Sequence, residues 1–344
     1  MKKLVIKDTL PDREIVHFAD AQQTITSRFN VVFVEKNGIT RTIRLPRRWW
    51  EAGMGVLRLA RRALRLDKCN VFPMGDNLII IRAGQAYLYD AASGQIQSTL
   101  KLRNCRNVLH QSLGATPDGH VYFGEYGANP ERTVVPVYRS TDGGKSWKTI
   151  YEFPASSIKH VHGCYYDPYE DAIWVCTGDF AGENRILVAN RDFSRLETIG
   201  DGSQKFRTCN FFFTPENVHW LMDSPLEASR HLKLSRQSRQ TTELQILPGP
   251  VWYSKSLTDG YFLAGTAQEV GPGVQDGFAH LLVSKDLVTW EDLQLFAHDG
   301  WPKRYFKFGV IGFADGEQTS KRFYLFCEAL SGYDGRVCQC EIVE

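Results

Sequence analysis

A short turn sequence recurs along this chain at intervals of roughly 45 residues, and it restricts the fold more than any other feature. Each copy places Pro, Asp, Asn or Gly in a tight turn and leads into a run of apolar and aromatic residues, which is the pattern of a β-hairpin. The copies lie at 74–77, 116–119, 167–171, 214–217, 257–260 and 313–316. This interval is typical of the four-stranded blades of a β-propeller.

The repeats predict an all-β fold, a six-bladed β-propeller that forms a single domain over residues 1–344. Five blades can be followed from Lys68 to Phe296, and the stretch from Tyr305 supplies three strands of another. Because a propeller leaves no open sheet edge, we expect the N-terminal segment to close the ring with the C-terminal blade. Seven blades remain an alternative, since residues 14–45 can hold most of a further blade.

The segment from Ser140 to Trp147 follows the pattern Ser-x-Asp-x-Gly-x-x-Trp. Asp142 can accept backbone N–H groups across a turn, Gly143 and Gly144 tolerate positive φ, and Trp147 can fold back onto the next strand. The motif resembles the Asp box, or BNR repeat, of the sialidase superfamily of β-propellers. A degraded copy spans residues 284–290. We expect the box to stabilise a turn remote from any active site.

Composition excludes some classes of function and narrows others. The 41 basic and 39 acidic residues leave a net charge of +2, which gives no support for nucleic-acid binding. No stretch approaches the roughly 20 apolar residues of a membrane span, and no signal peptide is visible. The eight cysteines lack metal-like spacing, so we expect free thiols, a cytoplasmic protein and no cofactor.

One segment, near residues 47–66, departs from the β pattern and predicts an inserted basic amphipathic helix. Its apolar positions are Trp50, Met54, Leu57, Ala60 and Leu64, and its basic positions are Arg58, Arg61, Arg62 and Arg65. Such a helix can contact a membrane surface, a partner or an anionic ligand. We expect instead that its apolar face packs on the propeller and its arginines face solvent.

In a propeller, the starts of innermost strands and the ends of second strands emerge on the same face. Polar residues recur at both places in the repeats, so we expect them to surround one mouth of the channel. The candidate catalytic residues are His110, His160, Glu125, Asp179, Asp223 and Tyr126. The candidate substrate-binding residues are Arg207, His162, Arg82, Lys307, Arg304 and Glu328.

His160 and His162 are two residues apart on a predicted strand, so both imidazoles face the same way. With His110 they can form a three-histidine metal site. A hydrogen-bonded pair and a catalytic base are the other interpretations. Because no fixed metal signature accompanies the pair, we assign no metal here.

The sialidase resemblance implies a glycoside hydrolase, with an arginine trio that holds the carboxylate of an acidic sugar. Arg82, Arg207 and Arg304 are the candidates for the trio. The resemblance further implies a tyrosine nucleophile, Tyr305 or Tyr333, activated by Glu125 or Glu269, and Asp179 as acid/base. The Arg-Ile-Pro signature of the family is missing from this chain.

Two other functions remain open. A polysaccharide lyase acting on a uronic-acid polymer would need a neutralised carboxylate, a base and an acid. Arg207 can supply the first, His110 or His160 the second, and Tyr126 or Tyr165 the third. The third function is a non-catalytic carbohydrate-binding or assembly propeller. We expect an enzyme that recognises an acidic oligo- or polysaccharide, with hydrolysis ahead of elimination.

Overall fold

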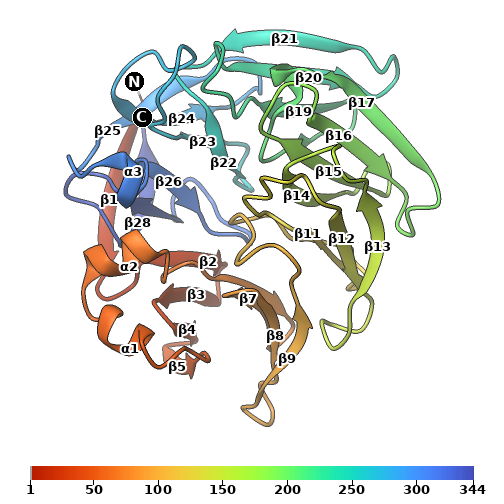
Figure 1. The fold of residues 1–344 in the computed structure, drawn as a ribbon. Coiled ribbons are helices and arrows are strands. Elements are labelled where there is room, and N and C mark those ends of the chain that lie inside the picture. Colours follow the sequence, from red (N-terminus) through yellow and green to blue (C-terminus); the bar gives the residue numbers. More distant parts are fainter. Residues whose placement is uncertain (1) are drawn as a thin grey trace. The chain divides into compact units, whose positions relative to one another are not determined.

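The computed structural model describes residues 2–344, and the chain divides into two compact units. The first unit comprises residues up to Cys69, Trp252–Val270 and Val274–Glu344, and the second comprises Asn70–Val251 and Gly271–Gly273. Both consist of four-stranded antiparallel sheets in which consecutive strands pair, the form of propeller blades (Figure 1). Among the described residues there are seven such blades, three in the first unit and four in the second.

The strands of the first unit form one blade near the N-terminus and two from the last third of the chain. They are β2 (Ile15–Ala19), β3 (Gln23–Arg28), β4 (Val31–Lys36) and β5 (Ile39–Arg44); β22 (Val251–Ser256), β23 (Phe262–Thr266), β24 (Phe278–Ser284) and β25 (Glu291–Ala297); and β26 (Val310–Phe313), β27 (Phe323–Glu328), β28 (Arg336–Val343) and β1 (Lys3–Leu10). The helices are α1 (Glu51–Met54), α2 (Arg58–Leu64) and α3 (Lys303–Phe306).

The second unit holds four blades that follow one another in sequence. They are β6 (Asn70–Met74), β7 (Asn77–Arg82), β8 (Gln85–Tyr89) and β9 (Ile96–Lys101); β10 (Gly114–Ala115), β11 (Val121–Gly124), β12 (Val135–Ser140) and β13 (Lys148–Phe153); β14 (His160–Asp167), β15 (Ala172–Gly178), β16 (Asn184–Ala189) and β17 (Leu196–Gly202); and β18 (Phe212–Phe213), β19 (Asn217–Leu221), β20 (Arg230–Ser235) and β21 (Thr241–Ile246). A short 3-10 helix spans Gln204–Phe206.

The prediction of six blades is wrong by one. Residues 15–44 form the complete blade β2–β5, so the seven-bladed alternative is the one that the structure bears out. The N-terminal strand β1 pairs with β28 along most of its length, from Lys3 opposite Val343 to Leu10 opposite Val337. The N-terminal segment therefore supplies the outer strand of the C-terminal blade.

The core lies between the facing sheets of consecutive blades. In the second unit, Tyr122 and Val137 of one blade pack in the same buried cluster as Val161, Ile173 and Val175 of the next. Alternate residues of each strand face this layer, as the period of two requires. Stacking of this kind aligns the strand ends of neighbouring blades, and it is at these ends that the candidate site residues lie.

The Asp box forms the turn between β12 and β13, the third and fourth strands of their blade. The Asp142 carboxylate accepts the Ser146 backbone N–H at 3.0 Å, and the Ser140 hydroxyl accepts the N–H of Gly144 at 2.8 Å. Both glycines have positive φ, 72° and 89°, as expected. Trp147 is only partly buried; it donates to the Thr99 hydroxyl and meets the Phe123 ring edge-on.

The inserted helix contradicts the sequence prediction in two ways. It is two short helices, α1 and α2, and its arginines rather than its apolar residues face inward. Arg61 and Arg62 are 1% and 2% exposed, whereas Leu57 is 67% exposed. The physical reason is a set of buried or partly buried acidic partners, most of them remote in sequence, which the helical periodicity could not reveal.

These partners and three arginines form what we call the arginine network of the first unit, consisting of Arg58, Arg61, Arg62, Glu14, Asp67, Asp299 and Asp334. Arg58 binds Asp334 through two nitrogens, at 3.1 and 3.0 Å, and Asp67 at 2.6 Å. Arg61 binds Asp67 at 2.8 Å and also Glu14, while Arg62 binds Asp299 at 2.5 Å. Burial, reinforced by Asp67, raises the pKa of Glu14 to about 7.

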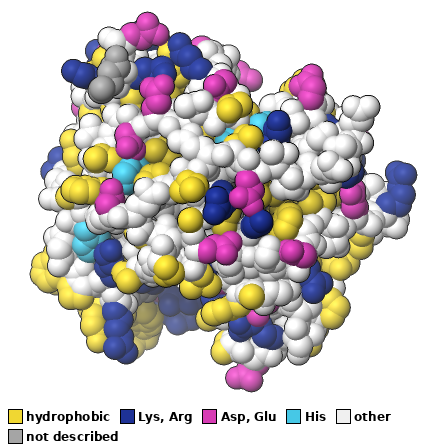
Figure 2. Space-filling view, turned by 90° about the horizontal axis from the view of Figure 1, so that it is seen from above, with side chains coloured by type: hydrophobic (Ala, Val, Ile, Leu, Met, Phe, Trp, Pro, Cys, Tyr) yellow, Lys and Arg dark blue, Asp and Glu magenta, His cyan; other side chains and the backbone are white. Residues whose placement is uncertain are grey.

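Charged side chains of both signs are interspersed on the face in Figure 2. This distribution agrees with the net charge of +2. Among residues 2–344, no helix is long and apolar enough to cross a membrane.

Candidate functional site

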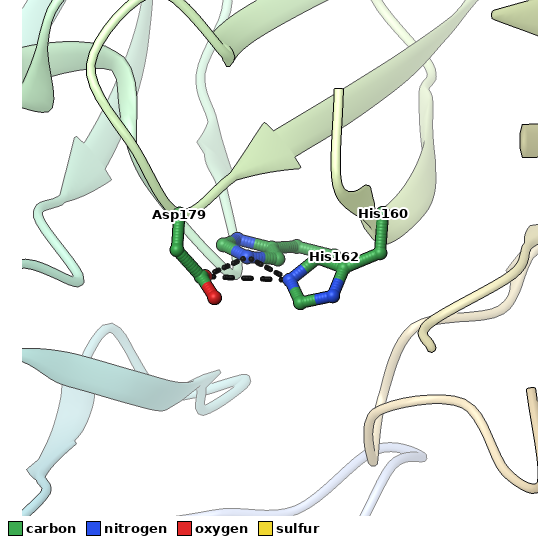
Figure 3. Close-up of side chains that lie close together, drawn as sticks. All are labelled: His160, His162 and Asp179. Carbon is green, nitrogen blue, oxygen red and sulfur yellow. Dashed lines mark hydrogen bonds and ion pairs between the residues drawn. The ribbon is translucent and has the colours of Figure 1, made fainter. Parts of the chain in front are cut away.

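The most concentrated group of polar side chains in the second unit lies at the ends of β14 and β15. His160 and His162 are the first and third residues of β14, and Asp179 directly follows the last residue of β15. Antiparallel pairing places His160 opposite Gly178, which brings Asp179 beside the histidines. Figure 3 shows the three side chains pointing toward one another.

The three side chains meet through one atom each. His160 Nε2 lies 3.2 Å from His162 Nε2, and Asp179 Oδ1 lies 3.3 Å from the former and 3.1 Å from the latter. We call these three atoms the acceptor triangle. Both histidines are buried, at 2% and 1% exposure. Gly178 permits this approach, because a Cβ there would lie 2.6 Å from a ring carbon of His162.

Backbone carbonyls fix the position of one hydrogen on each ring. His160 Nδ1 lies 2.7 Å from the carbonyl oxygen of Gly127, and His162 Nδ1 lies 2.8 Å from that of Thr208. A carbonyl oxygen can only accept, so each Nδ1 carries the hydrogen and donates it. In the neutral ring each Nε2 is then an acceptor, and all three atoms of the triangle offer lone pairs to the same space.

Two cations surround the carboxylate of the triangle. Lys159 Nζ lies 2.5 Å from Asp179 Oδ2, and Arg207 Nη2 lies 3.3 Å from Asp179 Oδ1. Arg207 also reaches Asp223, with 3.4 Å between Nε and Oδ2, and donates from Nη1 to the backbone oxygen of Asp179. Arg207 therefore links the ends of two blades, because Asp223 follows β19.

Asp223 and Cys209 form a buried extension of the cluster. The Cys209 thiol lies 3.3 Å from Asp223 Oδ2 and 3.5 Å from His162 Nδ1. Asp223 Oδ1 is buried without a hydrogen-bond partner. Tyr126 covers the other side, with its ring centroid 4.1 Å from that of His160.

Burial governs the pKa values in this cluster. It lowers the pKa of His160 and raises that of Asp223, although Arg207 opposes the latter shift. Burial alone would raise the pKa of Asp179, but the two histidines outweigh it and hold the pKa well below its usual range. The pKa of the Cys209 thiol is raised well above the ordinary value by burial and by Asp223.

Three other predicted residues of the second unit, Glu125, His110 and Arg82, contribute no atom to the triangle. Glu125 accepts the backbone N–H groups of Arg103 and Asn104, at 2.6 and 2.8 Å, and the Tyr138 hydroxyl, at 2.8 Å. His110 and Arg82 are buried before β10 and at the end of β7. The sequence suggested His110 as the third member of a possible metal site with the two histidines. Among the described residues, the group that could hold a metal with both histidines contains Asp179 instead.

Three predicted residues belong to the first unit. Lys307 binds Glu328 at 2.8 Å, and Lys68 binds the same carboxylate at 3.2 Å. Burial lowers the pKa of Lys307 to about 7, although Glu328 opposes the shift. Arg304 is exposed on α3, with its guanidinium over the Tyr305 ring.

Sequence reasoning missed Lys159, Cys209 and Gly178. Lys159 precedes β14 by one residue, so the rule that basic residues start innermost strands could have found it. Cys209 and Gly178 carried no comparable signal, because an apolar or small residue near a strand end is ordinary.

The comparisons with known proteins support the fold alone. The chain matches no family model, and no curated protein matches its sequence. The solved structure of the tricorn protease is 12% identical, with a TM-score of 0.53, and the match covers 98% of this chain. A putative TolB from Agrobacterium tumefaciens is also 12% identical, with a TM-score of 0.44, over 67% of this chain and 80% of that one.

The chain spans only 36% of the tricorn protease, and at 12% identity the likeness concerns architecture and not chemistry. The chain thus has a β-propeller fold, and its function has to be argued from the site.

Proposed function

We propose that the chain is a carbohydrate-active enzyme that recognises an acidic oligo- or polysaccharide at a divalent transition-metal ion held by His160, His162 and Asp179. The observation that carries the proposal is the acceptor triangle. Three lone pairs directed at one space repel one another unless a proton or a metal cation lies between them. A metal ion satisfies all three acceptors at once.

The size of the triangle fits such an ion. Tetrahedral ligands about 2.0–2.1 Å from zinc are about 3.3–3.4 Å apart, and adjacent octahedral ligands at similar bond lengths are about 3.0 Å apart. The measured edges of 3.1, 3.2 and 3.3 Å lie between these values. Two histidines and one carboxylate on a single face leave the remaining coordination positions for substrate or water.

The surroundings of the triangle also suit metal binding. A metal-binding histidine usually donates its other ring N–H to a carbonyl or carboxylate, which orients the ring. Both histidines do so here, to Gly127 and Thr208. Lys159 similarly holds the second oxygen of Asp179, leaving Oδ1 to face the histidines.

The charge of the loaded site favours an acidic substrate. A divalent ion together with Lys159 and Arg207 supplies four positive charges, whereas Asp179 and Asp223 supply at most two negative ones. A substrate carboxylate would offset this excess and would itself be polarised by the ion and by Arg207. The Asp-box resemblance supports a sugar as the rest of the substrate.

Among carbohydrate reactions, β-elimination makes better use of this arrangement than sialidase-like hydrolysis. Neutralising a carboxylate acidifies the adjacent C–H, and elimination then moves that proton to the leaving oxygen, forms a C=C bond and breaks a C–O bond without a co-reactant. Tyr126, beside His160, is the candidate to carry the proton. Hydrolysis has less support, since Glu125 is engaged with backbone N–H groups and Tyr138.

The first test measures metal separately from activity. Purified protein is stripped with a chelator and titrated with Zn²⁺, Mn²⁺ and Fe²⁺, and binding is followed by calorimetry and elemental analysis. We expect one ion per chain, lost in His160→Ala and His162→Ala. The matched control is His219→Ala, because His219 and His231 form a buried pair in another blade of the same unit. Equal binding by all variants would reject the site.

The second test offers the loaded protein uronic-acid polymers, sialosides and neutral glycans. Elimination is expected to give an ultraviolet-absorbing unsaturated product from the uronic-acid polymers, in a metal-dependent manner. New reducing ends without that absorbance would favour hydrolysis. Metal and saccharide binding without either product would favour the non-catalytic alternative.

A further inference from the structure

The segment from Lys36 to Leu66 has a charge balance unlike that of the whole chain. It contains nine lysines and arginines and a single acidic residue, Glu51, whereas the complete sequence has a net charge of only +2. Glu51 is buried, at 2% exposure. Arg44, Arg47 and Arg48 are exposed, and among the described residues no ion pair joins them to a carboxylate. These three exposed arginines therefore present positive charge at the surface of the segment.

Large apolar side chains project from the same segment. Trp49 is 88% exposed, Val56 73% and Leu57 67%, and Met54 and Leu64 are also exposed. We call these five residues the apolar helix face, since they lie on or next to α1 and α2. Soluble proteins expose single apolar residues routinely, but five large apolar side chains exposed within one short segment indicate an interaction surface.

The arginine network holds this face outward. Arg61 and Arg62 point inward from α2 to Glu14, Asp67 and Asp299. Turning the helix to bury Leu57 and Leu64 would break these buried ion pairs and expose their partners unpaired. The exposure of the apolar face is thus built into the packing of the first unit.

We propose that the apolar helix face docks on an anionic lipid bilayer. Trp and Leu side chains enter the boundary between headgroups and acyl chains, and neighbouring arginines bind acidic headgroups while their stems lie along the apolar surface. Charge complementarity selects this occupant: exposed arginines without acidic partners border apolar side chains. On α3, which binds Arg62 through the Phe306 carbonyl at 2.7 Å, Tyr305 is also exposed and can extend the contact.

The proposal is independent of the metal site and of the reaction. It describes a protein that binds the membrane surface without crossing it.

Vesicle flotation tests the docking with the full chain. Vesicles of phosphatidylcholine alone are compared with vesicles that contain phosphatidylserine, at low and at high salt. We expect flotation with the anionic vesicles only, reduced by salt. Replacing Arg47 and Arg48 by Ser should lower the partition coefficient at least about ten-fold, since each arginine near the surface contributes about five-fold.

The apolar contribution is tested by the double variant Trp49→Ala, Leu57→Ala. Leu226→Ala is the matched control, because Leu226 is 51% exposed in the second unit. We expect the double variant to lose flotation and the control to keep it, with unchanged thermal unfolding in both. Flotation that needs the arginines but not Trp49 and Leu57 would overturn docking through the apolar helix face and leave only electrostatic attraction to the anionic headgroups. Absence of flotation with wild-type protein would also overturn it.

Discussion

Two buried polar clusters of this chain follow opposite rules. In the arginine network of the first unit, guanidinium donors face carboxylate acceptors, as in the two-nitrogen contact of Arg58 with Asp334. In the second unit, the acceptor triangle brings together three atoms that all accept, at 3.1 to 3.3 Å. A network in which donors match acceptors is complete by itself and serves the fold. Under the proposed function, a bound metal ion completes the acceptors of the triangle.

The largest expected effect tests the completeness of the arginine network. Arg61→Met should lower the free energy of unfolding by about 3–5 kcal/mol, because the buried Glu14 and Asp67 lose one of the two guanidinium groups that bind them both. Chemical denaturation of variant and wild type measures the change. If this substitution were neutral, the network would not be what holds α2 in its inverted orientation, and the contrast with the triangle would fail.

The next effect concerns the triangle. Asp179→Asn should weaken binding of a divalent transition metal by more than about 100-fold, since even the loss of an outer partner of a ligand costs about 10- to 100-fold. Calorimetric titration of the stripped protein measures the affinity. The metal-free variant should lose less stability than Arg61→Met does, because Asn keeps one side-chain oxygen and Arg207 keeps its contacts with Asp223 and with the backbone oxygen of residue 179. A destabilisation as large as that of Arg61→Met would make the triangle structural too.

Trp147→Ala supplies a baseline outside both clusters. Because Trp147 is only partly buried, the loss of its contacts with Thr99 and Phe123 should cost about 1–3 kcal/mol, less than for a fully buried tryptophan. Thermal and chemical unfolding measure the cost, and metal affinity should stay at the wild-type value. A loss of metal binding would connect the Asp box to the site and contradict its role as a remote turn.

The smallest expected effect concerns Arg207, which we propose to bind the acidic group of the substrate. Arg207→Lys keeps the charge but loses the planar fork that reaches Asp179 and Asp223, so binding of an acidic oligosaccharide should weaken by about ten-fold. Metal affinity should change less than in Asp179→Asn. Calorimetry with a uronic-acid oligomer and with its neutral counterpart provides the measurement. Equal affinity of wild type and variant for the acidic oligomer would remove Arg207 from the proposed substrate site.

The sequence alone determined the kind of fold and most of the residues that meet at the site. Its repeated turns indicated blades, and the blade register located His160, His162, Asp179, Arg207 and Asp223 at strand ends. Turn geometry and strand alternation are local properties, so residues a few positions apart suffice to reveal them. The blade at 15–44 was harder to recognise, because the turn between β2 and β3, at residues 20–22, contains neither Pro nor Gly, unlike the recurring turns.

Only the tertiary structure decided what these residues do to one another. Each Nδ1 faces a backbone carbonyl, of Gly127 or Thr208, which lie 33 and 46 residues away in sequence from their histidines. Each Nε2 faces the carboxylate of Asp179. The orientation of α2 likewise depended on Asp299 and Asp334, which lie more than 200 residues beyond it. Helical periodicity records which residues share a face, but the partners that bury that face are set by contacts between distant segments.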